Sequence, residues 1–177
     1  DCAPLAKYAA GKKMIDVGCG AGFPGMPVAL LCDADVTLLD SLGKRITFLN
    51  ETIAEIGMTN AQAVHARAEE FGHREEFDLA TSRAVARLNV LAEISMPFVK
   101  VGGYFIAMKA VGSDEEIEEA KNVELNRQLY DLNSALSEID FNTDSEAWNN
   151  LANDIAGVEL AIQESTNAVQ DFDSKMR

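Results

Sequence analysis

The sequence predicts an α/β domain with a mainly parallel sheet, followed by an acidic α-helical hairpin or coiled-coil arm. Three observations support this prediction. Strand-like and helix-like segments alternate up to about residue 121, as in layered α/β domains. A glycine-rich turn joins the first strand to the first helix, and from Asn122 onward apolar residues recur at heptad spacing. We therefore divide the chain into residues 1–121 and residues 122–177.

The predicted sheet consists of five short segments rich in apolar and β-branched residues. These strands are expected at Lys13–Val17, Val36–Asp40, Ala61–Ala66, Phe77–Ser82 and Tyr104–Lys109. The last of them follows Gly102-Gly103, which is expected to turn the chain into the strand.

Helices are expected between the strands. Pro24 and Pro27 fall at or near the first turn of the first helix, where a missing N–H does little harm. The second helix has apolar residues at helical spacing and is expected to end at Gly57. The spaced residues are Ile46, Leu49, Ile53 and Ile56. A third helix with one apolar face is expected from about Ala84 to Ile94.

Two heptad series predict the arm. The first consists of Leu125, Leu129, Leu132, Leu136 and Ile139. The second consists of Trp148, Leu151, Ile155, Val158, Ile162, Ser165, Val169, Phe172 and Met176. Between them, Thr143 and Glu146 have the spacing of a capping box that opens the second helix. No glycine- or proline-rich linker precedes the arm, so the helix that begins near Asp114 is expected to run into it.

Charge is distributed unevenly along the chain, whose net charge is −14. Residues 1–113 carry 11 basic and 13 acidic side chains, whereas residues 114–177 carry 4 and 16. The first part is therefore compatible with a polyanionic partner, although it offers no large basic patch. The longest apolar run, Pro27–Cys32, is too short to span a membrane. The three cysteines lack metal-ligand spacing and no secretory signal is visible, so we expect a reduced, cytoplasmic protein without a metal site.

The glycine-rich turn is the first candidate binding element. Gly18, Gly20 and Gly22 alternate directly after a strand, and Asp16 precedes them. Glycines permit positive φ there and let a nucleotide-like ligand approach the backbone. By itself the turn is compatible with S-adenosylmethionine (SAM), a nicotinamide or a flavin. The acidic residue before the glycines resembles the pattern of class I SAM-dependent methyltransferases and favours SAM.

Two further segments are candidates for the same site. Asp40 lies at the tip of the second strand, where a carboxylate can accept both ribose hydroxyl protons; the alternative is a solvated acid. Ala68 and Glu69 follow the third strand, in the loop that passes the adenine in such folds. Glu69 and Glu70 could equally be solvated acids that open a helix.

The segment Thr81–Arg87 ends the fourth strand, at the sheet edge where substrate groups meet the cofactor in such folds. It has no Asn/Asp-Pro-Pro-aromatic motif, and no cysteine lies near the fourth or fifth strand. A methyl acceptor that needs no activation fits these observations, and guanine N7 is one. Transfer would need positioning rather than a general base, so no catalytic side chain is assigned. Arg83 is the candidate for orienting the guanine or the cofactor carboxylate; pairing with a surface acid is the alternative.

Five segments resemble, closely and in order, the RsmG (GidB) family of bacterial 16S rRNA guanine-N7 methyltransferases. They are DVGCGAGFPG, VTLLDSLGKRITFLN, RAEEFG, ATSRAVARLNVL and PFVKVGGYFIAMK. The resemblance covers residues 1 to about 121. It implies a Rossmann-like class I methyltransferase core, SAM as the methyl donor, and one guanine in the 530 loop of 16S rRNA, in the 30S subunit, as the acceptor.

The resemblance and the pattern of the turn together indicate site residues. Those expected to contact SAM are Gly18, Gly20, Gly22, Phe23, Asp40, Ala68, Glu69 and Arg83. Asp40 would be the ribose ligand. Candidates for RNA contacts, in basic loops or at strand ends, are Lys44, Arg45, Arg87 and Lys109. A solvated surface position is the equal alternative for each of these four.

Family members usually have a helical segment before residue 1, and a helix and two strands after the fifth strand. No β-rich run follows Asn122 in this chain. We therefore predict that residues 122–177 are foreign to the family, that the sheet is incomplete, and that Tyr104–Lys109 forms an exposed edge. A second hypothesis is a methyltransferase-like scaffold with weak or no catalysis that acts through the arm, in oligomerisation or partner binding. A small-molecule methyltransferase is disfavoured by the specificity of the motif set.

Overall fold

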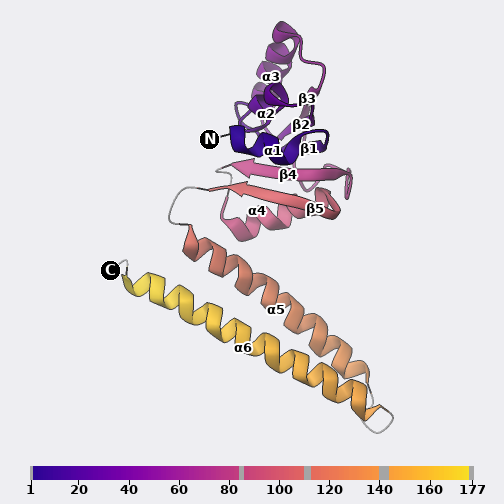
Figure 1. Cartoon of the computed structure of the whole chain (residues 1–177), viewed down its shortest axis with the longest axis vertical. Helices are drawn as coiled ribbons and strands as arrows, with labels where there is room; N and C mark the ends of the chain where they lie inside the picture. The colour runs from indigo at the N-terminus through magenta and orange to yellow at the C-terminus, as the bar shows by residue number, and fades with distance from the viewer. Residues whose placement is uncertain (1, 84–85, 110–112, 140–143, 176–177) are drawn as a thin grey trace. The chain divides into compact units, whose positions relative to one another are not determined.

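The structure is a computed structural model that describes residues 2–83, 86–109, 113–139 and 144–175, with side chains described up to residue 168. It forms two compact units, Asp1–Ala110 and Val111–Arg177. The first contains the sheet and the second contains two long helices (Figure 1). No helix in the described parts of the chain is both long and apolar enough to cross a membrane.

The first unit is built on a five-stranded sheet in which every pair of neighbouring strands is parallel. The strands are β1 (Lys13–Val17), β2 (Asp35–Asp40), β3 (Ala61–His65), β4 (Phe77–Arg83) and β5 (Val99–Met108). Their order across the sheet is β3-β2-β1-β4-β5. The chain therefore builds outward from β1 in one direction and then crosses to β4 and continues in the other. In such sheets the crevice at the carboxyl ends of the strands, beside this reversal, is where ligands bind.

Short helices connect the strands. They are η1 (Ala3–Leu5), α1 (Ala6–Ala9), α2 (Gly25–Leu31), α3 (Gly43–Ile56), α4 (Leu88–Ser95) and η2 (Met96–Phe98). Gly57 closes α3 at φ +68°, as expected for a helix stop, and Pro24 occupies the N-cap of α2. The third predicted helix begins at Leu88 rather than near Ala84; residues 84 and 85 lie outside the described part of the chain. The turns η1, α1 and η2 were not predicted.

Each face of the sheet buries its own apolar cluster, because successive side chains of a strand point to opposite faces. On one face Met14 of β1 packs with residues of α1, α2 and α3; on the other, Ile15 and Val17 pack with Phe77 and Phe98. Asp16 falls on the same face as Met14 and is fully buried. The alternation therefore places a carboxyl group inside the layer between the sheet and α2.

Strand β5 differs from the prediction. The expected turn at Gly102-Gly103 is wrong, because β5 already begins at Val99 and both glycines lie within it. The register shifts between Phe77, which pairs with Val99, and Leu79, which pairs with Tyr104, so the extra residues of β5 form a bulge. Gly102 has φ +83°, and a Cβ on Gly103 would lie 2.7 Å from the carbonyl oxygen of Asp78. The two glycines accommodate the bulge.

Strand β5 is also the last strand of the sheet. Among the residues that the structure describes, no strand follows it. As predicted, the segment from Tyr104 lies in an edge strand of the described sheet, and Val101 of β5 is almost fully exposed, at 96%.

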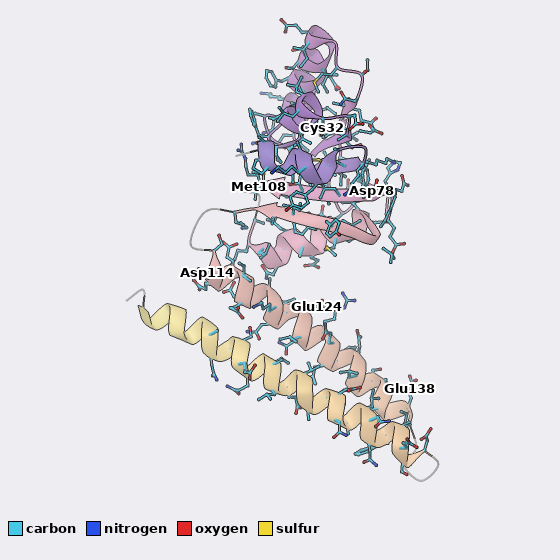
Figure 2. The ribbon with its side chains drawn as sticks, viewed as in Figure 1. Cys32, Asp78, Met108, Asp114, Glu124 and Glu138 are labelled. Carbon is cyan, nitrogen blue, oxygen red and sulfur yellow. The ribbon has the colours of Figure 1, made fainter. Side chains whose placement is uncertain are left out.

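The second unit is a helical hairpin of α5 (Asp114–Glu138) and α6 (Ser145–Lys175). The side chains of α5 radiate along its whole length in Figure 2, where Asp114, Glu124 and Glu138 are labelled. Position 121 lies within α5, which is continuous through it, as expected for a helix that starts near Asp114 and runs into the arm.

The predicted heptad positions up to Ser165 are half-buried or buried in the hairpin, whereas the side chains of Val169 and Phe172, and Met176 altogether, lie outside the described part of the chain. In α5 they are half-buried, and in α6 Ile155 and Ser165 are buried. The Ser165 hydroxyl donates to the carbonyl oxygen of Glu118 at 3.1 Å, which adds a polar contact to the seam. Thr143 of the predicted capping box lies outside the described residues. Asp144 Oδ1 accepts the N–H of Ala147 at 3.0 Å and so caps the start of α6.

Candidate functional site

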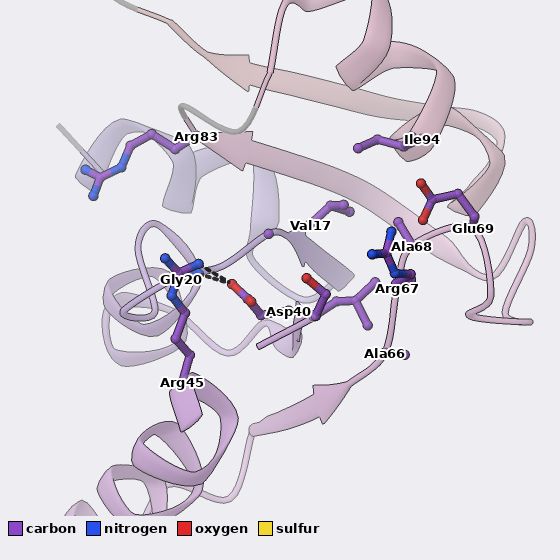
Figure 3. Close-up of a pocket in the computed structure, with 13 residues that line it drawn as sticks. Val17, Gly20, Asp40, Arg45, Ala66, Arg67, Ala68, Glu69, Arg83 and Ile94 are labelled. Atoms are coloured by element: carbon purple, nitrogen blue, oxygen red, sulfur yellow. Dashed lines mark hydrogen bonds and ion pairs between the residues drawn. The ribbon is translucent and has the colours of Figure 1, made fainter. Parts of the chain in front are cut away.

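A cavity of about 510 Å³ opens at the carboxyl ends of the strands, within the usual size range of small-molecule sites (Figure 3). Its lining comes from the ends of β1, β2 and β4, from the loops after β1, β2 and β3, and from the helices α3 and α4. The residues are Val17, Gly18, Gly20, Leu39, Asp40, Ser41, Arg45, Ala66, Arg67, Ala68, Glu69, Arg83 and Ile94. The cavity therefore lies where the topology predicts a ligand site.

The glycine-rich turn forms one wall of this cavity. Gly18, Gly20 and Gly22 have φ of +71°, +58° and +94°, so all three need the conformation that glycine adopts most easily. The N–H groups of Gly18 and Cys19 both donate to the carbonyl oxygen of Leu39, at 2.8 and 3.0 Å, which holds the turn against the end of β2. Burial raises the pKa of the Cys19 thiol far above its ordinary value, so this side chain is a packed thiol and not a nucleophile.

The glycines have different surroundings. A Cβ on Gly20 would meet no atom within 4 Å, because this residue borders the open cavity. A Cβ on Gly22 would lie 2.6 Å from Met26 Cγ and 2.8 Å from Leu49 Cδ2. Gly22 therefore lets the turn pack on α2 and α3, whereas Gly20 leaves room for a ligand.

Asp40 lies at the end of β2, and its carboxylate accepts hydrogen bonds from three donors. Its Oδ1 accepts the N–H of Leu42 at 2.8 Å. Its Oδ2 accepts the N–H of Gly20 at 2.9 Å and an N–H of Arg45 Nη1 at 3.1 Å (Figure 3). The Asp40 side chain is only 3% exposed, whereas the Arg45 side chain is 51% exposed. A fixed carboxylate is thus held at the cavity by two backbone donors and one movable side chain.

Asp16 lies beneath the glycine-rich turn. Its Oδ2 accepts the N–H of Gly25 at 2.8 Å, and its Oδ1 has no hydrogen-bond partner within the described structure. Burial raises the pKa of this carboxyl to about 7; the Gly25 hydrogen bond and the positive charge of Arg83 oppose the rise, and the charge of Asp40 adds to it. A Cβ on Gly25 would lie 2.9 Å from Oδ2, so glycine is needed at that position.

The remaining charged residues lie at opposite ends of the cavity. In Figure 3, Arg45 and Arg83 lie near Gly20, whereas Arg67 and Glu69 lie at the far end. The guanidinium of Arg83 is 5.3 Å from the centroid of the Phe23 ring. Polar groups of both signs are therefore available to a ligand that carries separated charges.

The structure brings most of the predicted cofactor residues together. Gly18, Gly20, Asp40, Ala68, Glu69 and Arg83 line the cavity. Gly22 and Phe23 are not among the lining residues; Phe23 is 45% exposed, and its ring lies beside the guanidinium of Arg83, which does line the cavity.

The residues predicted to contact RNA lie in two places, Lys44 and Arg45 on α3 and Arg87 and Lys109 near the start of α4. Arg45 lines the cavity, whereas Lys44 is exposed on α3 beside it. Arg87 is the N-cap of α4, and the Lys109 ammonium donates to the carbonyl oxygen of Ala86 at 2.6 Å.

Some lining residues were missed. Val17 and Leu39 lie at the carboxyl ends of strands and Ala66 directly follows one, so they could have been predicted from their positions in the sequence. Arg67 and Ser41 neighbour predicted residues. Ile94 reaches the cavity from α4 through packing that no local pattern reveals.

Comparison with known proteins agrees with this geometry. The family model described as rRNA small subunit methyltransferase G (GidB) matches residues 1–140, past the limit near residue 121 that the sequence motifs set. Ribosomal RNA small subunit methyltransferase G of Clostridium beijerinckii is 54% identical over 114 residues, which are 62% of this chain and 48% of the relative. The chain thus spans about half the length of the curated relatives that it matches.

Two solved structures share the fold. A candidate SAM-dependent methyltransferase of Methanococcus maripaludis has a TM-score of 0.55 and 17% identity, covering 87% of this chain and 74% of its own. A coclaurine N-methyltransferase bound to N-methylheliamine and SAH has a TM-score of 0.50 and 17% identity, covering 59% of this chain and 32% of its own. These similarities show a Rossmann-like methyltransferase fold. With the family match over residues 1–140, the chain belongs to the rRNA small subunit methyltransferase G (GidB) family.

Proposed function

We propose that the chain binds SAM and transfers its methyl group to N7 of a guanine in the 530 loop of 16S rRNA, in the small ribosomal subunit. One observation carries this proposal: the segment that matches the family contains the whole cavity at the carboxyl ends of the sheet. The protein would act in the cytoplasm, where ribosomal subunits are found in bacteria.

The lining of the cavity fits SAM. Asp40 offers a fixed, buried carboxylate for the ribose hydroxyls, and Gly20 leaves open space beside it. At the other end, Ala68 and Glu69 can meet the adenine edge through a backbone N–H and a carboxylate. Arg83 can pair with the carboxylate of the methionine part. SAH, which shares these groups with SAM, is bound in the coclaurine N-methyltransferase of similar fold.

The chemistry asks little of the protein beyond orientation. SAM supplies a methyl group made electrophilic by the sulfonium charge. Guanine N7 has a free lone pair, so no side chain has to remove a proton, and the N–C bond forms as the S–C bond breaks. The role left to this chain is to hold the acceptor in line with the methyl group. Arg83, at the end of β4 and against the Phe23 ring, is our candidate for orienting the guanine or the cofactor.

Contact with the RNA is proposed for Lys44, Arg45, Arg87 and Lys109. The first unit is nearly balanced in charge, so a polyanion can approach it more easily than it can approach the acidic hairpin.

Isothermal titration with SAM tests the cofactor half of the proposal. The native chain should release or take up heat, and Asp40→Ala should lose most of its affinity because the ribose ligand is gone. Lys44→Ala is the control, since Lys44 is an exposed neighbour outside the cavity lining. Methyl transfer to 30S subunits, mapped by strand cleavage at N7-methylguanine, then tests the acceptor.

A second function remains a proposal of its own because the chain spans about half the length of its relatives. In this alternative the domain is a scaffold with weak or no catalysis, and the hairpin mediates homo-oligomerisation or partner binding. Absence of SAM binding by the native chain would support it.

A further inference from the structure

We propose that Arg45 couples cofactor binding to RNA binding: its guanidinium pairs with Asp40, a ribose diol displaces it, and the displaced side chain then binds a phosphate of the RNA. This inference rests on the proposed function, since it needs both SAM at Asp40 and an RNA substrate. The Arg45 side chain would have two roles, as the partner of Asp40 before the ribose binds and as a phosphate contact afterwards.

The carboxylate of Asp40 can accept only a limited number of hydrogen bonds. Three already converge on it, from Leu42, Gly20 and Arg45. An ionised carboxylate has about four lone-pair sites. A ribose diol brings two O–H donors, so the total would exceed what the carboxylate can accept, and one of the present donors has to leave.

Arg45 is the donor that can leave. The N–H of Gly20 belongs to the turn that Gly18 and Cys19 hold against Leu39, and the N–H of Leu42 belongs to the backbone that starts α3. Moving either would disturb the backbone. The Arg45 side chain is half exposed and can rotate about its own bonds. Because an ion pair with one exposed partner contributes little, its loss reduces ligand affinity by a small factor.

The displaced guanidinium lies in a suitable place for RNA. Arg45 sits in the first turn of α3, and Figure 3 shows its side chain reaching from the helix to Gly20 and Asp40. The acceptor base has to come to this cavity, which brings the flanking phosphates close to its rim. A guanidinium binds phosphate oxygens through two parallel N–H donors. Phosphate and ribose then cooperate, because each favours the arrangement in which Arg45 has left Asp40, and such coupling is reciprocal.

The test is the affinity of the full chain for S-adenosylhomocysteine, which cannot transfer a methyl group, measured by isothermal titration with and without a saturating synthetic RNA hairpin of the 530-loop sequence. For the native chain, RNA should tighten S-adenosylhomocysteine binding by about two- to fivefold, because it releases Arg45 from Asp40 and so removes the cost of breaking that ion pair. Arg45→Gln should bind S-adenosylhomocysteine alone about two- to fivefold more tightly than the native chain. Its affinity should then change by less than about twofold when RNA is added.

Lys7→Gln is the matched control. It removes the same charge at an exposed position of α1, outside the cavity lining, and should leave the affinity for S-adenosylhomocysteine alone unchanged. Weaker binding by Arg45→Gln would overturn the proposal, because Arg45 would then be a cofactor contact. Native-like coupling in Arg45→Gln, or no coupling in the native chain, would also overturn it. Failure of the native chain to bind S-adenosylhomocysteine would instead defeat the proposed function, and this inference with it.

Discussion

Asp16 links the stability of the first unit to pH. Its pKa of about 7 lies above the ordinary value of 3.8, so between these values the folded state holds a proton that the unfolded state releases. The stability that Asp16 contributes is therefore full below about pH 4 and is lost as pH rises through about 7. Asp16→Asn keeps the shape without the titration. Between pH 5 and pH 8 the native chain should lose roughly 2 kcal/mol of unfolding free energy relative to the variant.

Urea denaturation followed by circular dichroism at the two pH values measures this difference. The two histidines are present in both proteins, so their titration cancels in the comparison. Parallel pH profiles for the native chain and Asp16→Asn would show that Asp16 is ionised in the folded state and would contradict the prediction.

Alanine variants at Gly20 and Gly57 distinguish the effect of backbone strain on stability from the effect of a side chain that occupies ligand space. Both have positive φ, +58° and +68°, and in both a Cβ would meet no atom within 4 Å. Alanine at either position should therefore reduce the unfolding free energy by about 1 kcal/mol. Only Gly20 borders the cavity, so only Gly20→Ala should also weaken SAM binding, by about tenfold or more. Titration of both variants with SAM checks this, and equal affinities would remove Gly20 from the site.

The site could be predicted from the sequence where strand ends determine it. Asp40 and Arg83 end strands, and Ala68 and Glu69 follow one closely; the carboxyl ends of parallel strands share one edge, so these residues line one cavity. The direction of a long side chain is set by its neighbours and not by its position in the chain. For this reason Arg45 was predicted to face RNA, although it also reaches Asp40.

At the scale of elements, Asn60 joins α2 to the strands that follow it. Its side-chain amide donates to the carbonyl oxygens of Ala29 and Ala34, at 2.9 and 3.0 Å, and more weakly to that of Cys32. Asn60→Ala would remove these hydrogen bonds and should lower the unfolding free energy by about 1–3 kcal/mol. Asn50→Ala, on the exposed face of α3, should change it by less than about 0.5 kcal/mol. Urea denaturation compares the two, and equal effects would mean that the Asn60 bonds add nothing.

Regular elements were easier to predict than irregular ones. The boundaries of β1 match the prediction, because a run of apolar residues between turn signals is a local property. The bulge in β5 depends instead on the neighbouring backbone at Asp78, which the sequence around Gly102-Gly103 does not show. A four-residue helix such as α1 contains a single turn and carries no periodic signal.

At the scale of the whole molecule, we expect SAM binding to need the sheet unit and not the acidic hairpin. Every residue that lines the cavity lies at or before Ile94, inside the unit that ends at Ala110. All five strands lie there too. A fragment of residues 1–110 should therefore fold and bind SAM with an affinity within about twofold of that of the full chain, as measured by isothermal titration.

RNA binding by the same fragment should differ from that of the full chain. Residues 111–177 hold 4 basic and 16 acidic side chains, so their removal takes away most of the net charge of −14. That charge repels a polyanion, and salt screens the repulsion within about 10 Å at ordinary ionic strength. At low salt the fragment should thus bind the synthetic 530-loop RNA more tightly than the full chain does. The difference between the two affinities should shrink as salt is added. Fluorescence anisotropy of labelled RNA measures both affinities. If the full chain bound RNA more tightly than the fragment at low salt, the helices α5 and α6 would have to contact the RNA directly, and their negative charge would not control RNA binding.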